Sequence, residues 1–171
     1  MAEHLVIQGK TKEELYATLL PQLEALVEGE TDEIANMANI SACIMETFRF
    51  WWVGVYRVMP TTHPYSTING NIMSEELVLG PFQGPLACTR IRKGKGVCGT
   101  AWEKAETIVV PDVEQFPGHI ACSSASKSEI VVPIIKDGKV TAVLDIDSEH
   151  LGTFNETDKF WLDKLAAIIG R

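Results

Sequence analysis

The spacing of apolar residues changes twice along this 171-residue chain, and these changes limit the folds that it can form. Residues 11–27 and 31–48 carry apolar stripes at helical spacing, the first behind the capping box Thr11-Lys-Glu-Glu14. Residues 50–147 contain short β-branched and aromatic runs, and helical spacing returns after Asn155. An antiparallel sheet covered on one side by the terminal helices buries these stripes, so we expect an α+β fold.

The middle of the chain divides into strands and turns. Strands are expected at residues 50–58, 77–80, 108–110, 129–135 and 140–147, with a short helix at 100–105. The last two strands are joined at Asp137-Gly138, which is typical of a hairpin. Residues 59–75 have several turn-forming residues and no sustained apolar period, so they predict a long connection that is either a lid or a plain insertion.

Length and composition indicate one domain over residues 1–171, with enough apolar residues to form a core without disulfides or metals. The formal charge of −8 argues against a nucleic-acid surface. There is no run of apolar residues long enough to span a membrane, and the N-terminus does not resemble a signal peptide. We therefore expect a cytoplasmic protein whose four cysteines are mostly free thiols.

Three cysteines, Cys88, Cys98 and Cys122, lie in Gly- or Ser-rich segments rather than in apolar runs. A reducing compartment keeps structural disulfides open, so exposed loop thiols indicate sulfur chemistry. Cys43, by contrast, falls inside the second predicted helix and is expected to be a small buried hydrophobe.

Cys98 belongs to a G-x-G-x-x-G sequence, Gly94 to Gly99. A dinucleotide site needs this turn inside a parallel strand-helix-strand unit, and only about two helical turns of 3.6 residues fit before Ile108. The glycines instead indicate a sharp turn into a short helix, whose N-terminus would favour the Cys98 thiolate.

Small neighbours leave Cys122 accessible, and the backbone N–H groups around it suit an anion. These arguments do not choose between Cys98 and Cys122 as nucleophile, while Cys88 is expected to respond to the first thiol. A zinc set of the three cysteines with His119 is disfavoured, because the spacing lacks the close ligand pairs of structural zinc sites. No metal is therefore expected.

Asp145 and Asp147 alternate with apolar residues, so both face one side of the sheet. They are either simply exposed or line a pocket with Glu129, where repulsion and burial would raise a carboxyl pKa and supply a proton donor. A two-residue turn pairs Glu129 with Ile146 and turns it away from both aspartates. A three-residue loop, or a bulge near Glu129, would restore a common face.

Several segments of the chain resemble the free methionine-(R)-sulfoxide reductases, which have a GAF-domain fold. These are Leu77–Gly84, Ala87–Ile91, Gly94–Ala101, Gly118–Cys122, Ser128–Val131 and Gly138–Ser148. The resemblance extends from about Leu15 to Ile169. It implies a reductase that needs no cofactor and is recycled by a thioredoxin-type reductant, and it implies a homodimer through the terminal helices.

The resemblance also implies roles for single residues. Cys122 matches the cysteine that attacks the sulfoxide sulfur and becomes a sulfenic acid. Cys88 matches the cysteine that converts this sulfenic acid to a disulfide. Cys98 matches a third cysteine, which is an alternate partner in disulfide exchange. The implied substrate contacts are Glu129, Asp145 and Asp147 for the ammonium group, Trp52 and Tyr56 for the methyl-sulfur end, and the N–H groups of Ile120, Ala121 and Cys122 for the carboxylate.

One segment departs from the family pattern. The connection at residues 59–75 is longer than the usual one after the Trp-x-Gly-x-Tyr strand. The resemblance therefore does not predict the shape of the pocket entrance or a lid motion, whereas the implied catalytic roles are unaffected. Two other functions compete with the reductase: a non-catalytic GAF module that binds a small molecule, and a thiol redox sensor that uses the same cysteines.

Overall fold

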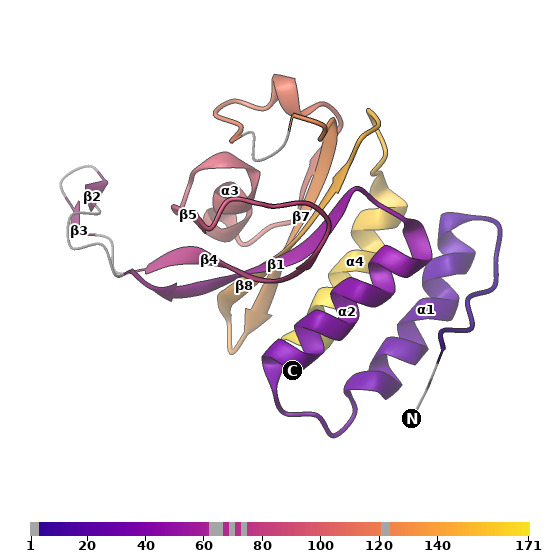
Figure 1. The fold of residues 1–171 in the computed structure, drawn as a ribbon. Helices are drawn as coiled ribbons and strands as arrows, with labels where there is room; N and C mark the ends of the chain where they lie inside the picture. Colours follow the sequence, from indigo (N-terminus) through magenta and orange to yellow (C-terminus); the bar gives the residue numbers. More distant parts are fainter. Residues whose placement is uncertain (1–3, 62–66, 69–70, 73–74, 121–123) are drawn as a thin grey trace.

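The computed structural model describes residues 4–61, 67–68, 71–72, 75–120 and 124–171. Its centre is a six-stranded antiparallel sheet with the strand order β5-β4-β1-β8-β7-β6. Helices α2 and α4 cover one face of this sheet, α1 packs against these two helices, and α3 lies on the other face (Figure 1). Within the described ranges, no helix is both long and apolar enough to cross a membrane. The predicted α+β class is confirmed.

The helices are α1 Lys12–Val27, α2 Glu33–Phe48, α3 Gly96–Lys104 and α4 Glu156–Ile169, with a 3-10 turn at Val113–Gln115. The sheet strands are β1 Trp52–Pro60, β4 Glu75–Gln83, β5 Arg90–Ile91, β6 Ile108–Val110, β7 Ser128–Lys136 and β8 Lys139–Ser148. Two further short strands, β2 Thr67–Ile68 and β3 Asn71–Ile72, form a separate pair.

The three long helices begin where their capping residues predict. Thr11 and Glu14 form the expected capping box of α1, and Asn155 caps α4 in a second box with Asp158. Asp32 caps α2 by accepting a hydrogen bond from the Ala35 N–H. In each case a side-chain oxygen satisfies a backbone N–H of the first turn that has no partner within the helix.

The prediction for residues 59–75 was wrong in part. Strand β1 continues to Pro60 and pairs there with Glu75, the first residue of β4, because the ladder between these strands extends past the apolar run. The pair β2–β3 lies beyond this end of β1, whereas Trp52 starts the opposite end (Figure 1). Strand β5 was also not expected, and α3 begins four residues earlier than predicted.

Alternation along the strands gives each face of the sheet its own apolar cluster. Val53 and Val55 of β1 pack toward α1, α2 and α4 in the larger cluster. Trp52 and Tyr56 point the other way and belong to a second cluster with Cys98 and other residues of α3. The second cluster forms the wall of the candidate site.

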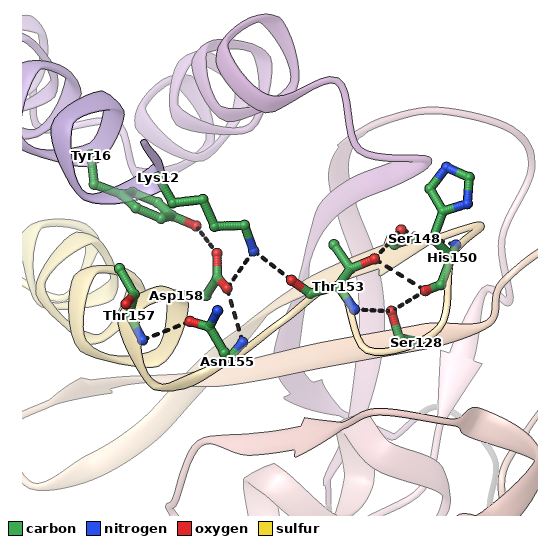
Figure 2. A network of polar contacts seen from close by, with 9 residues as sticks. All are labelled: Lys12, Tyr16, Ser128, Ser148, His150, Thr153, Asn155, Thr157 and Asp158. Atoms are coloured by element: carbon green, nitrogen blue, oxygen red, sulfur yellow. Dashed lines mark hydrogen bonds and ion pairs between the residues drawn. The ribbon is translucent and has the colours of Figure 1, made fainter. Parts of the chain in front are cut away.

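A polar network ties α1 and α4 to the loop that follows β8 (Figure 2). The fully buried carboxylate of Asp158 accepts hydrogen bonds from Tyr16 Oη at 3.0 Å and Lys12 Nζ at 2.6 Å. In the same network, Thr153 donates from Oγ1 to Ser148 Oγ at 2.7 Å, and Ser128 donates from Oγ to the His150 carbonyl at 2.6 Å. Because Ser128 and Ser148 adjoin Glu129 and Asp147, the network holds the strand ends that carry these acids.

Replacing Asp158 by alanine should lower the free energy of unfolding by about 3–5 kcal/mol, because it leaves the buried Tyr16 hydroxyl and the Lys12 ammonium without their shared acceptor. Urea denaturation of the purified variant measures this loss. Asp163→Ala is the matched control, because Asp163 is an exposed acid on the same helix and loses with this change a surface hydrogen bond from Thr107 in place of a buried network. Equal losses in the two variants would show that the buried network contributes nothing specific.

Candidate active site

The pairing of β7 with β8 brings three acids to one face of the sheet. The turn has two residues, Asp137 and Gly138, both with positive φ. The register shifts directly after it, so that Thr141 is an extra residue between the pairs Ile135–Val140 and Ile134–Ala142. The bulge therefore lies beside the two-residue turn, and neither of the two expected devices, a three-residue loop or a bulge near Glu129, is present in this hairpin.

As a result of this shift, Glu129 lies opposite Asp147, and Asp145 lies opposite Val131. Side chains directly opposite each other in a ladder share a face, so Glu129 joins both aspartates on the side that faces α3. The alternative in which both aspartates are simply exposed is wrong: Asp145 is only 6% exposed, and Asp147 is half-buried and lines the same cavity. Glu129 beside them is also 6% exposed.

These acids line a cavity between α3 and the sheet. The volume in which the centre of a water molecule can lie is about 40 Å³. It contains seven of the residues predicted from the sequence: Trp52, Tyr56, Cys98, Ile120, Glu129, Asp145 and Asp147. The other lining residues are Trp51, Pro85, Leu86, Ala87, Ile91, Lys95, Gly96, Val97, His119 and Ser126.

The three carboxyl groups hold protons more strongly than free acids do. Burial, followed by repulsion from Asp145, raises the pKa of Glu129 well above its usual range. Burial and the charge of Asp147 do the same to the pKa of Asp145. Burial raises the pKa of Asp147 to about 6, against the opposing effect of a hydrogen bond from Ser126. At neutral pH the site therefore contains both protonated and ionised carboxyl groups.

Cys98 lies in the first turn of α3, as predicted, but its expected thiolate character was wrong. The side chain is only 3% exposed, and burial followed by the charges of Asp145 and Glu129 raises the pKa of its thiol well above the usual value. Desolvation and two facing carboxyl groups thus outweigh the effect of the helix N-terminus. Cys98 is a buried, protonated thiol and not an exposed loop cysteine.

His119 and Ser126 complete the acidic side of the cavity. His119 Nε2 lies 3.7 Å from Glu129 Oε2. Burial lowers the pKa of His119 while the pKa of Glu129 is raised, so at neutral pH this is a contact between neutral groups and not an ion pair. Ser126 Oγ donates a hydrogen bond to the Asp147 carboxylate, which positions that side chain and favours its charged form.

The aromatic wall depends on a glycine. The Trp52 and Tyr56 rings stack with centroids 6.0 Å apart, and a Cβ at Gly54 would lie 2.4 Å from the Trp52 ring. Trp52 donates from Nε1 to the Pro85 carbonyl at 3.1 Å, and Tyr56 donates from Oη to the Cys88 carbonyl at 3.0 Å. These two hydrogen bonds fix the backbone before and after Leu86 and Ala87, two residues that line the cavity.

The G-x-G-x-x-G sequence does not lie in a parallel strand-helix-strand unit, in agreement with the rejection of a dinucleotide site. All pairings in the main sheet are antiparallel. Gly99 is required for packing, because a Cβ there would lie 2.3 Å from the Arg92 carbonyl oxygen. The glycines thus allow the loop to close tightly on α3, which brings Cys98 to the acids.

The described cysteines fall into two states. Cys88 is half-buried and disulfide-bonded. Cys98 and Cys43 are free thiols, and Cys43 packs against the main core from α2 as expected, although it is half-buried and not fully buried. Cys122 and Ala121 lie outside the described residues, so their predicted roles stay predictions.

Sequence reasoning missed several members of the site. Ser126, Lys95 and Trp51 were not proposed as site residues, and His119 was considered only as a weak zinc ligand. Ser126 precedes Glu129 by three residues, but no local pattern marks a serine as the partner of an aspartate 21 residues away. These contacts arise only when β7, β8 and the loop before β7 come together.

Comparisons with known proteins agree with this geometry. The GAF domain family model matches residues 45–171. GAF domain-containing protein A of Dictyostelium discoideum is 54% identical over 169 residues, covering 99% of both chains. The free methionine-R-sulfoxide reductase of Saccharomyces cerevisiae is 43% identical over 168 residues, covering 94% of this chain and 86% of the relative.

A solved structure extends the comparison to three dimensions. The X-ray structure of free methionine-R-sulfoxide reductase from Neisseria meningitidis, in complex with its substrate, has a TM-score of 0.87 and 50% sequence identity. The match covers 98% of this chain and 93% of that one. The resemblance inferred from the sequence is thereby confirmed: the chain belongs to the free methionine-R-sulfoxide reductase family of GAF-domain proteins.

Proposed function

We propose that this chain reduces free L-methionine-(R)-sulfoxide to L-methionine in the cavity between α3 and the sheet. The observation that carries the proposal is the set of three acids, Glu129, Asp145 and Asp147, facing one aromatic-walled cavity. A thiol cannot remove the sulfoxide oxygen efficiently unless that oxygen is protonated, and a buried acid with a raised pKa is a suitable donor at neutral pH.

The reaction proceeds in two thiol steps. The Cys122 thiolate attacks the sulfoxide sulfur while the oxygen takes a proton, and oxygen transfer yields methionine and a Cys122 sulfenic acid. The Cys88 thiol then displaces water and forms a disulfide with Cys122. In sum, one sulfoxide and two thiols become one thioether, one disulfide and one water. The finding that Cys88 is disulfide-bonded, while Cys98 and Cys43 are free, supports its part in this cycle.

The acids divide two tasks in this proposal. Glu129 and Asp145, with the more strongly raised pKa values, share the proton that the sulfoxide oxygen receives. Asp147, whose pKa is about 6, is mostly ionised at neutral pH and attracts the substrate ammonium group. Ser126 supports this division because its hydrogen bond favours the ionised form of Asp147.

The remaining contacts fix the substrate's orientation. Trp52 and Tyr56 hold the methyl-sulfur end, and the N–H groups of Ile120, Ala121 and Cys122 receive the carboxylate. Ile120 lines the cavity, which supports its part. Because the site binds both the free ammonium group and the free carboxylate of the amino acid, methionine sulfoxide within a peptide chain is excluded.

The proposed cycle needs a dithiol to reopen the disulfide, and a thioredoxin-type reductant in the cytoplasm supplies it. We further propose that residues 1–171 act as one GAF-like domain, and that two copies associate through the terminal helices. Cys98, a buried and protonated thiol, is at most a slow alternate partner in disulfide exchange.

The first test measures methionine released from free L-methionine-(R)-sulfoxide, from its S epimer and from the N-acetylated R compound, with dithiothreitol as reductant. Turnover of the free R epimer alone is expected. Release from the N-acetylated compound would contradict recognition of the ammonium group by the acids. No release from any of the three, together with peroxide oxidation of Cys122 that thioredoxin reverses, would instead identify a redox sensor.

A further inference from the structure

We propose that Cys98, Glu129 and Asp145 form a binding site for a thiophilic divalent cation of the Zn²⁺ type, and that the bound ion excludes the amino-acid substrate. The site itself rests on the geometry of these three residues. The exclusion of substrate rests also on the proposed function, which assigns Glu129 and Asp145 to the sulfoxide oxygen of the same substrate.

The three side chains converge from three elements. Cys98 comes from α3, Glu129 from β7 and Asp145 from β8, and each is 6% exposed or less. One donor atom from each, the thiol sulfur and two carboxylate oxygens, lies within 4.8 Å of the other two. Zn–S and Zn–O bonds of about 2.0–2.3 Å place tetrahedral ligands roughly 3.3–3.8 Å apart, so the donors need to close by no more than about 1.5 Å.

A second observation indicates that a cation belongs here. Asp145 Oδ1 is buried and has no hydrogen-bond partner among the described residues. A buried carboxylate oxygen without a partner is costly, so native structures normally satisfy it by a donor or an ion. The neighbours around it, two carboxyl groups and a thiol, are groups that become anionic ligands on losing a proton.

The donor types select the class of ion. A thiolate sulfur favours Zn²⁺ and Cd²⁺ over Mg²⁺ and Ca²⁺, which prefer sites made only of oxygen. His119 provides a further ligand of the same class, because its Nε2 lies 3.7 Å from Glu129 Oε2 and its ring lines the cavity. Cys98 thereby has a function in this proposal that does not require it to exchange disulfides.

Cd²⁺ is the probe for the experiment, because a Cd–thiolate bond absorbs in the ultraviolet. The Cys43→Ser variant is titrated in its disulfide form. Among the described cysteines, Cys88 is then bonded and Cys43 is replaced, so Cys98 is the remaining free thiol. We expect one Cd²⁺ per chain with a thiolate absorption band. The band should be lost in Cys98→Ala, and Glu129→Gln and Asp145→Asn should each weaken binding at least tenfold.

The disulfide form also allows the competition to be measured without turnover. Free methionine-(R)-sulfoxide should shift the Cd²⁺ titration to higher metal concentration in proportion to its own concentration. A missing band, or a band that persists in Cys98→Ala, would overturn the site. A titration that the sulfoxide leaves unchanged would overturn the exclusion of substrate. Since the binding readout needs no catalysis, it stands or fails separately from the reductase assay.

Discussion

Replacing Cys122 by serine is expected to abolish methionine formation from the free R sulfoxide, with a loss on the order of 10³-fold or more, because a hydroxyl at neutral pH is a far weaker nucleophile than a thiolate. The assay is methionine release in the presence of dithiothreitol. Cys43→Ser is the control, because that thiol packs against the main core on the opposite face of the sheet and should leave turnover unchanged. Full activity of Cys122→Ser would remove this residue from the mechanism.

The Cys88→Ser variant separates the two thiol steps. Without reductant it should release one methionine per chain and accumulate a sulfenic acid at Cys122, which dimedone traps and mass spectrometry locates. The wild type should release the same amount and trap none, because Cys88 closes the disulfide. Since the Cys98 thiol is buried and its pKa is raised, it should not replace Cys88 quickly. A rapid disulfide with Cys98 in this variant would contradict that assignment.

Replacing one of the two proton-donating acids by its amide should lower kcat/KM strongly. Glu129→Gln and Asp145→Asn keep the side-chain shape but remove the proton that the sulfoxide oxygen requires, and general-acid catalysis typically contributes about 10²- to 10⁴-fold. Steady-state kinetics with the free R sulfoxide measures the loss. Each variant should be about as stable as wild type in urea, because an amide of nearly the same shape replaces a carboxyl group whose burial disfavours the charged form. Loss of activity together with loss of stability would indicate misfolding instead.

The pH dependence follows from the same pKa shifts. As pH falls through about 6, Asp147 takes up a proton and loses its attraction for the substrate ammonium, so kcat/KM should fall on this side. As pH rises, Glu129 and Asp145 lose their shared proton, and kcat/KM should fall again. Asp147→Asn should remove the limb near pH 6 and raise KM at neutral pH. An unchanged acid limb in this variant would assign that limb to another group.

Stability should respond to pH in the opposite sense to that of an ordinary surface acid. The folded pKa of Asp147, about 6, lies above its unfolded value of 3.8, so between these values the folded state binds more protons than the unfolded state. The contribution of Asp147 to the free energy of unfolding therefore decreases as pH rises from about 4 to 6. Urea denaturation across this range should show a smaller decrease in Asp147→Asn.

Local sequence determined most of the elements of this protein. The capping boxes at Thr11 and Asn155, the stripes of α1, α2 and α4, and the Asp137-Gly138 turn each depend on residues a few positions apart, so their physics is complete within a short segment. The alternation that places Asp145 and Asp147 on one face is equally local. The segments that carry the loop cysteines and this alternation also resembled the family to which the comparisons assign the chain.

Tertiary structure decided what no short segment contains. The face of Glu129 depends on the extra residue Thr141 at the far end of the hairpin, because one bulge shifts every later pair. The protonated state of Cys98 depends on burial against β7 and β8, and the charge of Asp147 on the hydrogen bond from Ser126. Desolvation and pairing are properties of packed neighbours, so the chemistry of the site became readable only when the elements were assembled.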